Sequence, residues 1–255
     1  MLNYRNTSIA IIILTVAFFV SGPYTSNAIT LLYCLAVFFY IIMLVIGASR
    51  IQMNFFLKAL NKGNPNVAKV AITFDDGPDR ETSIELLNVL KKHQVKATFF
   101  CIGSKVEENG HILKEISNSG HLIGNHTWSH AFLFDFFLPA KMIREIQKTD
   151  TIIEHVTGTK VKLFRPPYGV TNPFLSKALK KTKHTVIGWS LRTFDTTMGR
   201  QKVLDKIERR LKNGDIIVFH DTNPNIIKLL DDAIILIKQK GMEIVNLDEL
   251  LNLKD

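Results

Sequence analysis

Two adjacent carboxylates, Asp75 and Asp76, follow a short apolar run and precede the dipeptide Gly77-Pro78. A Gly-Pro turn bends the chain, so both side chains can reach the end of the preceding strand instead of opposite faces of a sheet. Because adjacent carboxylates repel each other, a bound cation or a shared proton is the natural compensation. Taken alone, the segment would also fit an Asp-rich turn that only caps the following helix.

His126 and His130 stand at positions i and i+4 of the segment HTWSH. On one helical turn, two such imidazoles lie on the same face and can bind one metal ion. Two imidazoles and one carboxylate form the usual three-ligand set of a catalytic zinc site, which leaves a position open for water. Asp76 could supply the oxygen ligand, although an isolated HxxxH pair also occurs on helices that bind no metal.

Two further motifs carry ionisable side chains beside rigid or apolar segments. Arg165 opens the segment RPPYG at 165–169, in which each proline restricts its own φ angle. This rigidity favours an arginine that positions a carboxylate or a substrate group over a simple surface charge. The run IIVFHD at 216–221 ends in His220. A histidine with a carboxylate nearby is suited to general acid catalysis.

Short β-rich runs alternate with amphipathic helices from Val67 onward. The pattern predicts seven strands, at 69–74, 97–102, 122–124, 162–164, 185–189, 216–219 and 243–245. It predicts helices at 83–92, 112–117, 140–156, 173–181, 201–212 and 225–240, with a last helical turn at 248–253. Strands that alternate with helices indicate a mostly parallel sheet covered by helices.

The chemically interesting side chains all follow predicted strands. They are Asp75 and Asp76 after the first strand, His126 and His130 after the third, Arg165 after the fourth, Asp195 after the fifth, and His220 at the end of the sixth. Parallel barrels and open α/β sheets both place their chemistry at the carboxyl ends of strands. The sequence therefore predicts one shared site at this edge of the sheet.

Two uncharged apolar runs open the chain, at about 8–24 and 28–48. At about 1.5 Å per helical residue, the second run is long enough to cross a hydrocarbon core of roughly 30 Å. The first is either a short span or the apolar core of a signal peptide cleaved near Ser26-Asn27-Ala28. We favour a hairpin of two transmembrane helices. The predicted organisation is a membrane anchor at 1–50, a linker at 51–65 and a catalytic domain at 66–255.

The charges that flank these runs predict their orientation. Arg5 precedes the first run, Arg50, Lys58 and Lys62 follow the second, and the intervening turn carries no charge. By the positive-inside rule, both ends of the hairpin and the domain should lie in the cytoplasm of a two-pass integral membrane protein. A single uncleaved span would instead place the domain outside.

The overall charge of +9 comes from 32 Lys and Arg against 23 Asp and Glu. Residues 1–65 hold four of the basic residues and none of the acidic ones, so the remainder carries an ordinary 28 against 23. The sequence shows no basic stripe interleaved with aromatic residues, which argues against nucleic acid as a partner. It predicts no protein partner either, and Cys34 and Cys101 predict no disulfide.

Four motifs together resemble the polysaccharide deacetylases of carbohydrate esterase family 4. They are TFDDGP at 73–78, HTWSH at 126–130, RPPYG at 165–169 and IIVFHD at 216–221. The resemblance covers roughly residues 68 to 250. It implies a deformed (β/α) barrel with fewer than eight strands, here a (β/α)7-type barrel preceded by the two transmembrane helices.

The resemblance also implies the roles of individual residues. Asp76, His126 and His130 would hold a divalent metal, with Zn²⁺ expected. Asp75 would act as general base, and His220 would protonate the departing sugar amine.

Further residues would support this chemistry by the same resemblance. The backbone N–H of Tyr168 would stabilise the oxyanion, and Arg165 would orient Asp75. Pro167 and Trp189 are expected to contact substrate together with Tyr168. Such enzymes commonly carry an Asp shortly after this Trp as partner of the arginine. Arg192 follows here, so we assign the partner role to Asp195, the next carboxylate.

The resulting prediction is a metal-dependent hydrolase that removes an N-acyl group, with acetyl expected, from an amino sugar. The glycan would be a polysaccharide, peptidoglycan or a lipid-linked glycan. One alternative is a deformylase or deacetylase of a polyprenyl-linked sugar precursor at the cytoplasmic membrane face. Another is a non-catalytic, membrane-anchored carbohydrate-binding module, for which Arg192 is the supporting feature.

Overall fold

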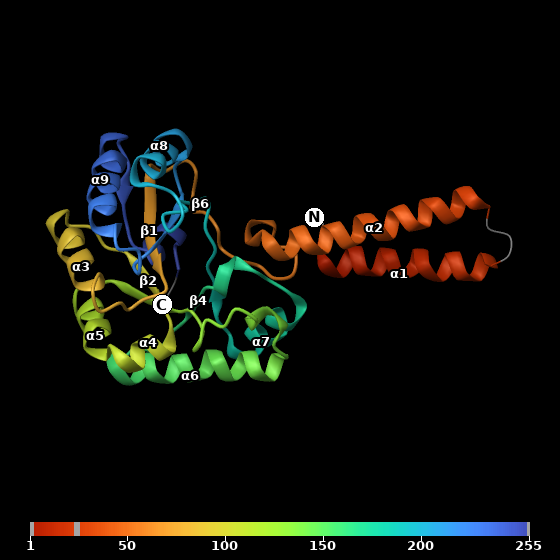
Figure 1. Ribbon diagram of the computed structural model, residues 1–255, viewed down its shortest axis with the longest axis horizontal. Helices are drawn as coiled ribbons and strands as arrows, with labels where there is room; N and C mark the ends of the chain where they lie inside the picture. Colours follow the sequence, from red (N-terminus) through yellow and green to blue (C-terminus); the bar gives the residue numbers. More distant parts are fainter. Residues whose placement is uncertain (1–2, 23–25, 254–255) are drawn as a thin grey trace.

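The computed structural model of the chain describes residues 3–22 and 26–253. It comprises an α/β domain and a pair of long helices that project from one side of it (Figure 1). The ends of two predictions, residues 23–24 of the first span and 254–255 of the domain, lie outside the described residues.

The projecting helices are α1 (Tyr4–Ser21) and α2 (Asn27–Ser49), which run side by side as a hairpin (Figure 1). Ser8 and Tyr40 share a hydrogen bond of 2.8 Å between their hydroxyl oxygens, and the rings of Phe18 and Tyr33 stack with centroids 4.2 Å apart. Both helices are long and apolar enough to cross a membrane, a test that a signal sequence also passes.

An eight-stranded sheet forms the centre of the domain, and its strand pairs are parallel. The strands are β1 (Lys69–Asp75), β2 (Thr98–Cys101), β3 (Leu122–Asn125), β4 (Leu163–Phe164), β5 (Thr185–Val186), β6 (Leu191–Arg192), β7 (Ile216–His220) and β8 (Glu243–Ile244). Their order is β5-β4-β3-β2-β1-β7-β6, with β8 beside the start of β1. The path ends at β5 and β6 without closing, so the sheet is an open, incomplete barrel.

The predicted seven-stranded barrel was therefore right in its parallel α/β character and wrong in its strand count. The additional strand is β6, whose two residues are too few to show an alternating pattern. The prediction had instead extended the fifth strand to Trp189, whereas β5 ends at Val186.

Helices cover the sheet close to the predicted positions. They are α3 (Ser83–Lys92), α4 (Gly103–Glu108), α5 (Gly110–Asn118), α6 (Pro139–Thr157), α7 (Pro173–Thr182), α8 (Arg200–Arg210), α9 (Ile226–Gln239) and α10 (Leu247–Leu251). Helix α4 was not predicted, because six residues are too few to show a helical repeat.

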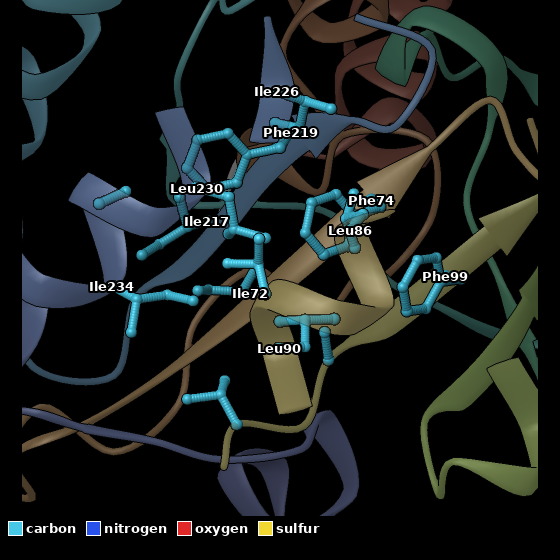
Figure 2. Close-up of a cluster of buried hydrophobic side chains, with 14 of the residues drawn as sticks. Ile72, Phe74, Leu86, Leu90, Phe99, Ile217, Phe219, Ile226, Leu230 and Ile234 are labelled. Carbon is cyan, nitrogen blue, oxygen red and sulfur yellow. The ribbon is translucent and has the colours of Figure 1, made fainter. Parts of the chain in front are cut away.

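The alternation of side chains along β1 and β7 separates the core from the site. Ile72, Phe74, Ile217 and Phe219 point to one face, where they pack against α3 and α9 (Figure 2). The residues that alternate with these point to the opposite face of the sheet. Among them, Ala71, Ile216 and Val218 belong to a second apolar cluster. Because the alternation has a period of two, Thr73, Asp75 and His220 continue this second face toward the carboxyl edge of the sheet.

The segment 51–65 differs from the predicted linker because most of it packs against the domain. Ile51, Phe55 and Ala59 are buried, with relative exposures of 2% to 3%. Leu60 then forms an isolated bridge with Ile187, and Lys62 forms one with Asp215. The segment thus runs from the chain that follows β5 to the start of β7. Apolar side chains four residues apart give it a buried face that a free linker would lack.

Candidate active site

Arg165 and Asp75 form a buried ion pair at the carboxyl edge of the sheet. Arg165 has no exposed surface, and its Nη1 donates hydrogen bonds to Asp75 Oδ1 at 2.6 Å and to Thr73 Oγ1 at 2.8 Å. Its remaining nitrogens donate to the backbone oxygens of Ile187 and Gly188. Burial lowers the pKa of Arg165, and the charge and hydrogen bond of Asp75 oppose that change. The arginine thereby holds Asp75 in one orientation.

Asp76, His126 and His130 converge as predicted, with one ligand atom from each lying within 4.8 Å of the others. Asp76 Oδ1 is 3.5 Å from His126 Nε2 and 3.4 Å from His130 Nε2. This oxygen is buried and has no hydrogen-bond partner among the described residues. A buried carboxylate oxygen without a donor, facing two imidazole nitrogens, fits a divalent cation with nitrogen and oxygen ligands.

The orientation of His126 also fits metal binding. Its Nδ1 lies 2.7 Å from the backbone oxygen of Arg165 and donates to it, which leaves Nε2 facing Asp76. Burial opposes ionisation of Asp76, but the neighbouring His126 and His130 outweigh it and hold the pKa of the carboxyl below its ordinary range. Burial, together with the charge of His126, lowers the pKa of His130 to about 4.

The helical turn predicted for His126 and His130 was wrong, because both residues lie in a loop after β3. Thr127 has φ 67° and His130 has φ 45°, values that a right-handed helix excludes. The buried Asn125 supports the loop, since its Oδ1 accepts a hydrogen bond of 2.8 Å from the Thr127 N–H. Left-handed residues, rather than the i and i+4 geometry of a helix, bring the two rings within 4.8 Å.

His220 and Asp195 form the second ion pair of the site, which corrects the predicted pairing of Asp195 with Arg165. His220 Nδ1 lies 2.9 Å from Asp195 Oδ1, and the His220 N–H donates to Asp195 Oδ2 at 3.0 Å. The reason is the missed strand. Since β6 pairs with β7, the chain that follows β6 places Asp195 beside the end of β7, where His220 lies.

The electrostatics of this pair suit a proton donor. Burial alone would lower the pKa of His220, but the hydrogen bond to Asp195 and the charge of Asp75 outweigh it and raise the pKa above its ordinary value. The same contact lowers the pKa of Asp195 against the effect of burial. Asp75 and His220 are direct partners in the register of β1 and β7, so base and acid candidates face the same space.

One cavity of about 240 Å³ is lined by the three candidate metal ligands, Asp76, His126 and His130, together with Asp75 and His220. Its walls include Tyr168 and Trp189, two of the residues expected to contact substrate, and also Arg192. Pro167, also expected to contact substrate, is buried and does not line the cavity. Tyr168 has φ 56°, and the hydrogen bonds that close its turn use the N–H groups of Gly169 and Val170.

Backbone strain concentrates around this cavity. Nine of the described non-glycine residues have a positive φ, and five of them lie on the loops of the site: Asp76, Thr127, His130, Tyr168 and Phe194. Such conformations are costly and typical of functional sites, where the surrounding structure imposes them.

Several residues that support the site were not predicted from the sequence. Thr73 accepts from Arg165, Asn125 holds the histidine loop, and Thr193 Oγ1 lies 2.9 Å from Asp195 Oδ1. Their polarity inside or directly after apolar strands was the available signal. Asp221 is fully buried, and its Oδ2 accepts a hydrogen bond of 3.0 Å from Ser83 Oγ. Burial raises the pKa of Asp221 to about 7.

Comparison with known proteins gives consistent matches. The family model described as polysaccharide deacetylase matches residues 62–187. A peptidoglycan-N-acetylglucosamine deacetylase of Bacillus cereus is 35% identical over 190 residues, which covers 72% of this chain and 69% of that protein. Two of the other curated relatives, a peptidoglycan-N-acetylmuramic acid deacetylase of Bacillus subtilis and a peptidoglycan-N-acetylglucosamine deacetylase of Listeria monocytogenes, are longer, and the chain spans 38% to 40% of their length.

Solved structures match over the same region. The Bc1960 peptidoglycan N-acetylglucosamine deacetylase superposes with a TM-score of 0.72 at 33% identity, which covers 76% of this chain and 92% of that chain. BA3943 of Bacillus anthracis, described as a CE4 family pseudoenzyme, gives 0.71 at 30% identity over 76% of this chain and 68% of that chain. The same fold therefore occurs in a protein described as a deacetylase and in one described as a pseudoenzyme. The functional argument must rest on the side chains in the cavity.

Proposed function

Since the chain belongs to the polysaccharide deacetylase family, we propose that it removes the acetyl group from an N-acetylated amino sugar of a peptidoglycan-type glycan. The observation that carries the proposal is the convergence of three features around one cavity. These are a carboxylate held by a buried arginine, a histidine paired with a second carboxylate, and a cluster of three side chains suited to a cation.

Asp76, His126 and His130 would hold the metal, and we propose zinc because of the two imidazoles and single carboxylate. A divalent metal at this position would supply Lewis acidity and lower the pKa of a bound water. The hydrogen bond from His126 to the Arg165 carbonyl fixes the ring for this role.

Asp75 would accept the proton of the attacking water. Its Oδ1 already accepts a hydrogen bond from Arg165, which leaves Oδ2 as the oxygen that can receive this proton. Arg165 acts as a positioning residue, since it holds the base without lining the cavity. The backbone N–H of Tyr168 is suited to stabilise the negative charge that develops on the acetyl oxygen.

His220 would deliver a proton to the departing amine. Because Asp195 accepts only, it keeps the proton on Nδ1 and directs Nε2 away from itself. Its charge also favours the protonated ring that a proton donor requires.

We further propose that α1 and α2 anchor the enzyme in a membrane. Their length and composition support this, as does the position of Arg5, Arg50 and Lys58 near the domain end of the hairpin. The same charges favour a domain at the cytoplasmic face. A substrate at that face would be a nucleotide- or lipid-linked amino sugar.

Fusion of reporters to the carboxyl end of the full chain tests the orientation. This position is preferable to a fusion within 51–65, since that segment packs against the sheet. Activity of a reporter that works only in the cytoplasm is the expected result. Activity of a reporter that works only outside would overturn the proposed orientation and make polymeric peptidoglycan the substrate.

Acetate release by the full chain in detergent or lipid discs tests the function. We expect release from N-acetylglucosamine oligomers or lipid-linked N-acetylglucosamine, loss of activity with a chelator, and recovery with Zn²⁺. Asp76→Ala should abolish both activity and metal content, whereas Glu154→Gln, an exposed carboxylate on α6, should change neither. Binding of oligosaccharide without acetate release under any divalent metal would favour the non-catalytic module.

A further inference from the structure

A second cavity, of about 600 Å³, adjoins the candidate active site, because Trp189 and Arg192 line both. We call it the basic cavity. Six cationic side chains line it: Lys62, Arg192, Lys206, Arg209, Arg210 and Lys212. They come from the segment after α2, from β6, and from α8 and the residues that follow it.

Negative charge in the basic cavity is scarce. Its one acidic lining residue is Asp215, whose Oδ1 lies 3.4 Å from Lys62 Nζ. The two carboxylate oxygens of Asp215 also accept hydrogen bonds from Ser190 Oγ and from the backbone N–H of Lys212, each at 2.8 Å. The other cations of the cavity have no ion pair with a described residue, so most of its positive charge is uncompensated.

The cations also crowd one another. Lys206 Nζ lies 3.9 Å from the centroid of the Phe194 ring, and the Arg192 guanidinium lies 4.9 Å from the same centroid. Burial and the charges of Arg210 and Arg192 lower the pKa of Lys206. Because like charges repel each other, a bound anion would stabilise this arrangement.

The chemistry of these side chains identifies the kind of anion. Guanidinium groups bind phosphate oxygens through paired N–H donors, and lysine adds a compact charge. A gathering of this size exceeds what a single carboxylate requires. Its composition therefore suits a phosphate or diphosphate group.

The position of the basic cavity connects it with both the site and the hairpin. Gln52, three residues after α2, lines the cavity, and its Nε2 donates a hydrogen bond of 3.0 Å to the Trp189 oxygen. In Figure 1, β6 lies on the side of the sheet that faces the base of α2. A substrate bound here could reach from the catalytic cavity toward the hairpin.

We propose that the basic cavity binds a phosphate or diphosphate group carried by the same amino sugar whose acetamide occupies the catalytic cavity. The inference rests on the proposed deacetylase function and specifies its substrate as a sugar 1-phosphate derivative. In such a sugar, the phosphate and the acetamido group stand on neighbouring ring carbons. Two adjacent cavities that share Arg192 on their wall match this arrangement.

Kinetics of the full chain with charged and neutral substrates test the proposal. The test variant is Lys206→Gln/Arg210→Gln, which leaves the catalytic cavity intact. Its matched control is Lys160→Gln/Lys228→Gln, which removes two exposed lysines elsewhere on the domain. The substrates are a neutral N-acetylglucosamine oligomer, N-acetylglucosaminyl diphosphoryl polyprenol of short chain length, and UDP-N-acetylglucosamine.

We expect the test variant to raise KM for the diphosphate substrates by about 10- to 100-fold, since two charge-assisted contacts are lost. Its kinetics with the neutral oligomer, and all kinetics of the control, should stay within about twofold. Rising salt should weaken turnover of the diphosphate substrates alone. An equal effect on charged and neutral substrates, or no effect, overturns the proposal.

The two diphosphate substrates distinguish the source of the phosphate. If the double substitution raises KM for the lipid-linked sugar alone, the substrate is lipid-linked. If it raises KM for both, nucleotide sugars are substrates as well.

Binding of inorganic diphosphate to the full, unmodified chain separates this proposal from the proposed function. Calorimetry should detect binding that the Lys206→Gln/Arg210→Gln substitutions weaken at least about tenfold. Absence of acetate release by the unmodified chain would refute the deacetylase function while this binding stands. Absence of diphosphate binding in a chain that deacetylates neutral oligomers would refute the basic cavity alone.

Discussion

The catalytic cavity and the basic cavity share a wall but differ in whether their charged side chains are paired with opposite charges. In the catalytic cavity, Asp75 is paired with Arg165, and His220 is paired with Asp195. In the basic cavity, cations of β6 and α8 face the space without acidic partners among the described residues. The difference indicates that the first site is organised before substrate arrives, whereas the second depends on a ligand to supply its counter-charge.

Burial explains why the two cavities can differ. An unpaired ion deep in the protein would cost several kcal/mol, so the fully buried Arg165 requires its partners. Arg209 and Arg210 are exposed and remain hydrated, so leaving them without an anionic partner costs little free energy. Substitutions that break the pairs should therefore have much larger effects on the catalytic side.

Asp75→Asn should have the largest effect on activity. The amide keeps the shape of the side chain but removes the proton acceptor, so kcat/KM for acetate release should fall by about 10²- to 10⁴-fold. Activity and zinc content would be measured together, with Glu154→Gln as the control. Loss of zinc in parallel would mean that the substitution disturbs the neighbouring Asp76, and unchanged activity would remove Asp75 from the mechanism.

Arg165→Met should have the largest effect on stability. It leaves the Asp75 carboxylate buried without a cation, which should lower the free energy of unfolding by about 3–5 kcal/mol. Denaturant titration measures this change. Arg200→Met breaks an exposed pair with Asp232 and should cost no more than about 1 kcal/mol. Asp75→Asn combined with Arg165→Met should recover part of the loss, and failure to do so would contradict a role for charge pairing.

Asp195→Asn should act through pH. The Asp195 carboxylate raises the pKa of His220 against burial, so its removal lowers that pKa. A proton donor with a lower pKa loses its proton earlier as pH rises, so the alkaline limb of the kcat/KM profile should move to lower pH. The ratio of activity at pH 8 to activity at pH 6 should therefore be lower in the variant than in the unmodified chain. An unmoved alkaline limb in a folded, zinc-loaded variant would separate His220 from proton donation.

Asp221→Asn should have the smallest effect and sharpens the comparison further, since Asp221 is a buried acid held by a hydroxyl instead of a cation. Its pKa of about 7 lies above the ordinary value of an unfolded chain, so the folded state keeps a proton that the unfolded state releases. Stability should therefore decline as pH rises from about 4 to beyond 7. Asp221→Asn should reduce that decline by about 1–3 kcal/mol between pH 5 and pH 8, measured by urea unfolding. A parallel decline in both proteins would assign it to other groups.

Much of the site was predictable because the sequence shows where apolar strands end and which residues alternate along them. Asp75 and His220 each end an apolar run, and the register of β1 with β7 brings them together as expected. Asp76, His126 and His130 were likewise predicted as one cluster. Their prediction succeeded through residue type, since the helical geometry from which it was argued is absent.

The predictions were wrong where the structure depends on very short strands or on packing between residues distant in the sequence. β6 has two residues, and without it Asp195 was assigned to Arg165 instead of His220. The segment 51–65 was predicted as a linker because turn-forming residues replace the apolar pattern at 61–66 (NKGNPN). In the folded chain, Ile51, Phe55 and Ala59 are buried against the domain. The local sequence pattern does not indicate this packing.

The sequence by itself determined the chemistry of this protein: which carboxylates, imidazoles and guanidinium groups stand at strand ends, and that two apolar runs precede them. These properties depend on residue type and on short-range periodicity. Only the tertiary structure decided which charges are paired and which are not. Lys62, Arg192 and Arg210 are spread over nearly 150 residues of an unremarkable charge pattern, and they line one cavity because the order of β1, β7 and β6 brings distant segments side by side.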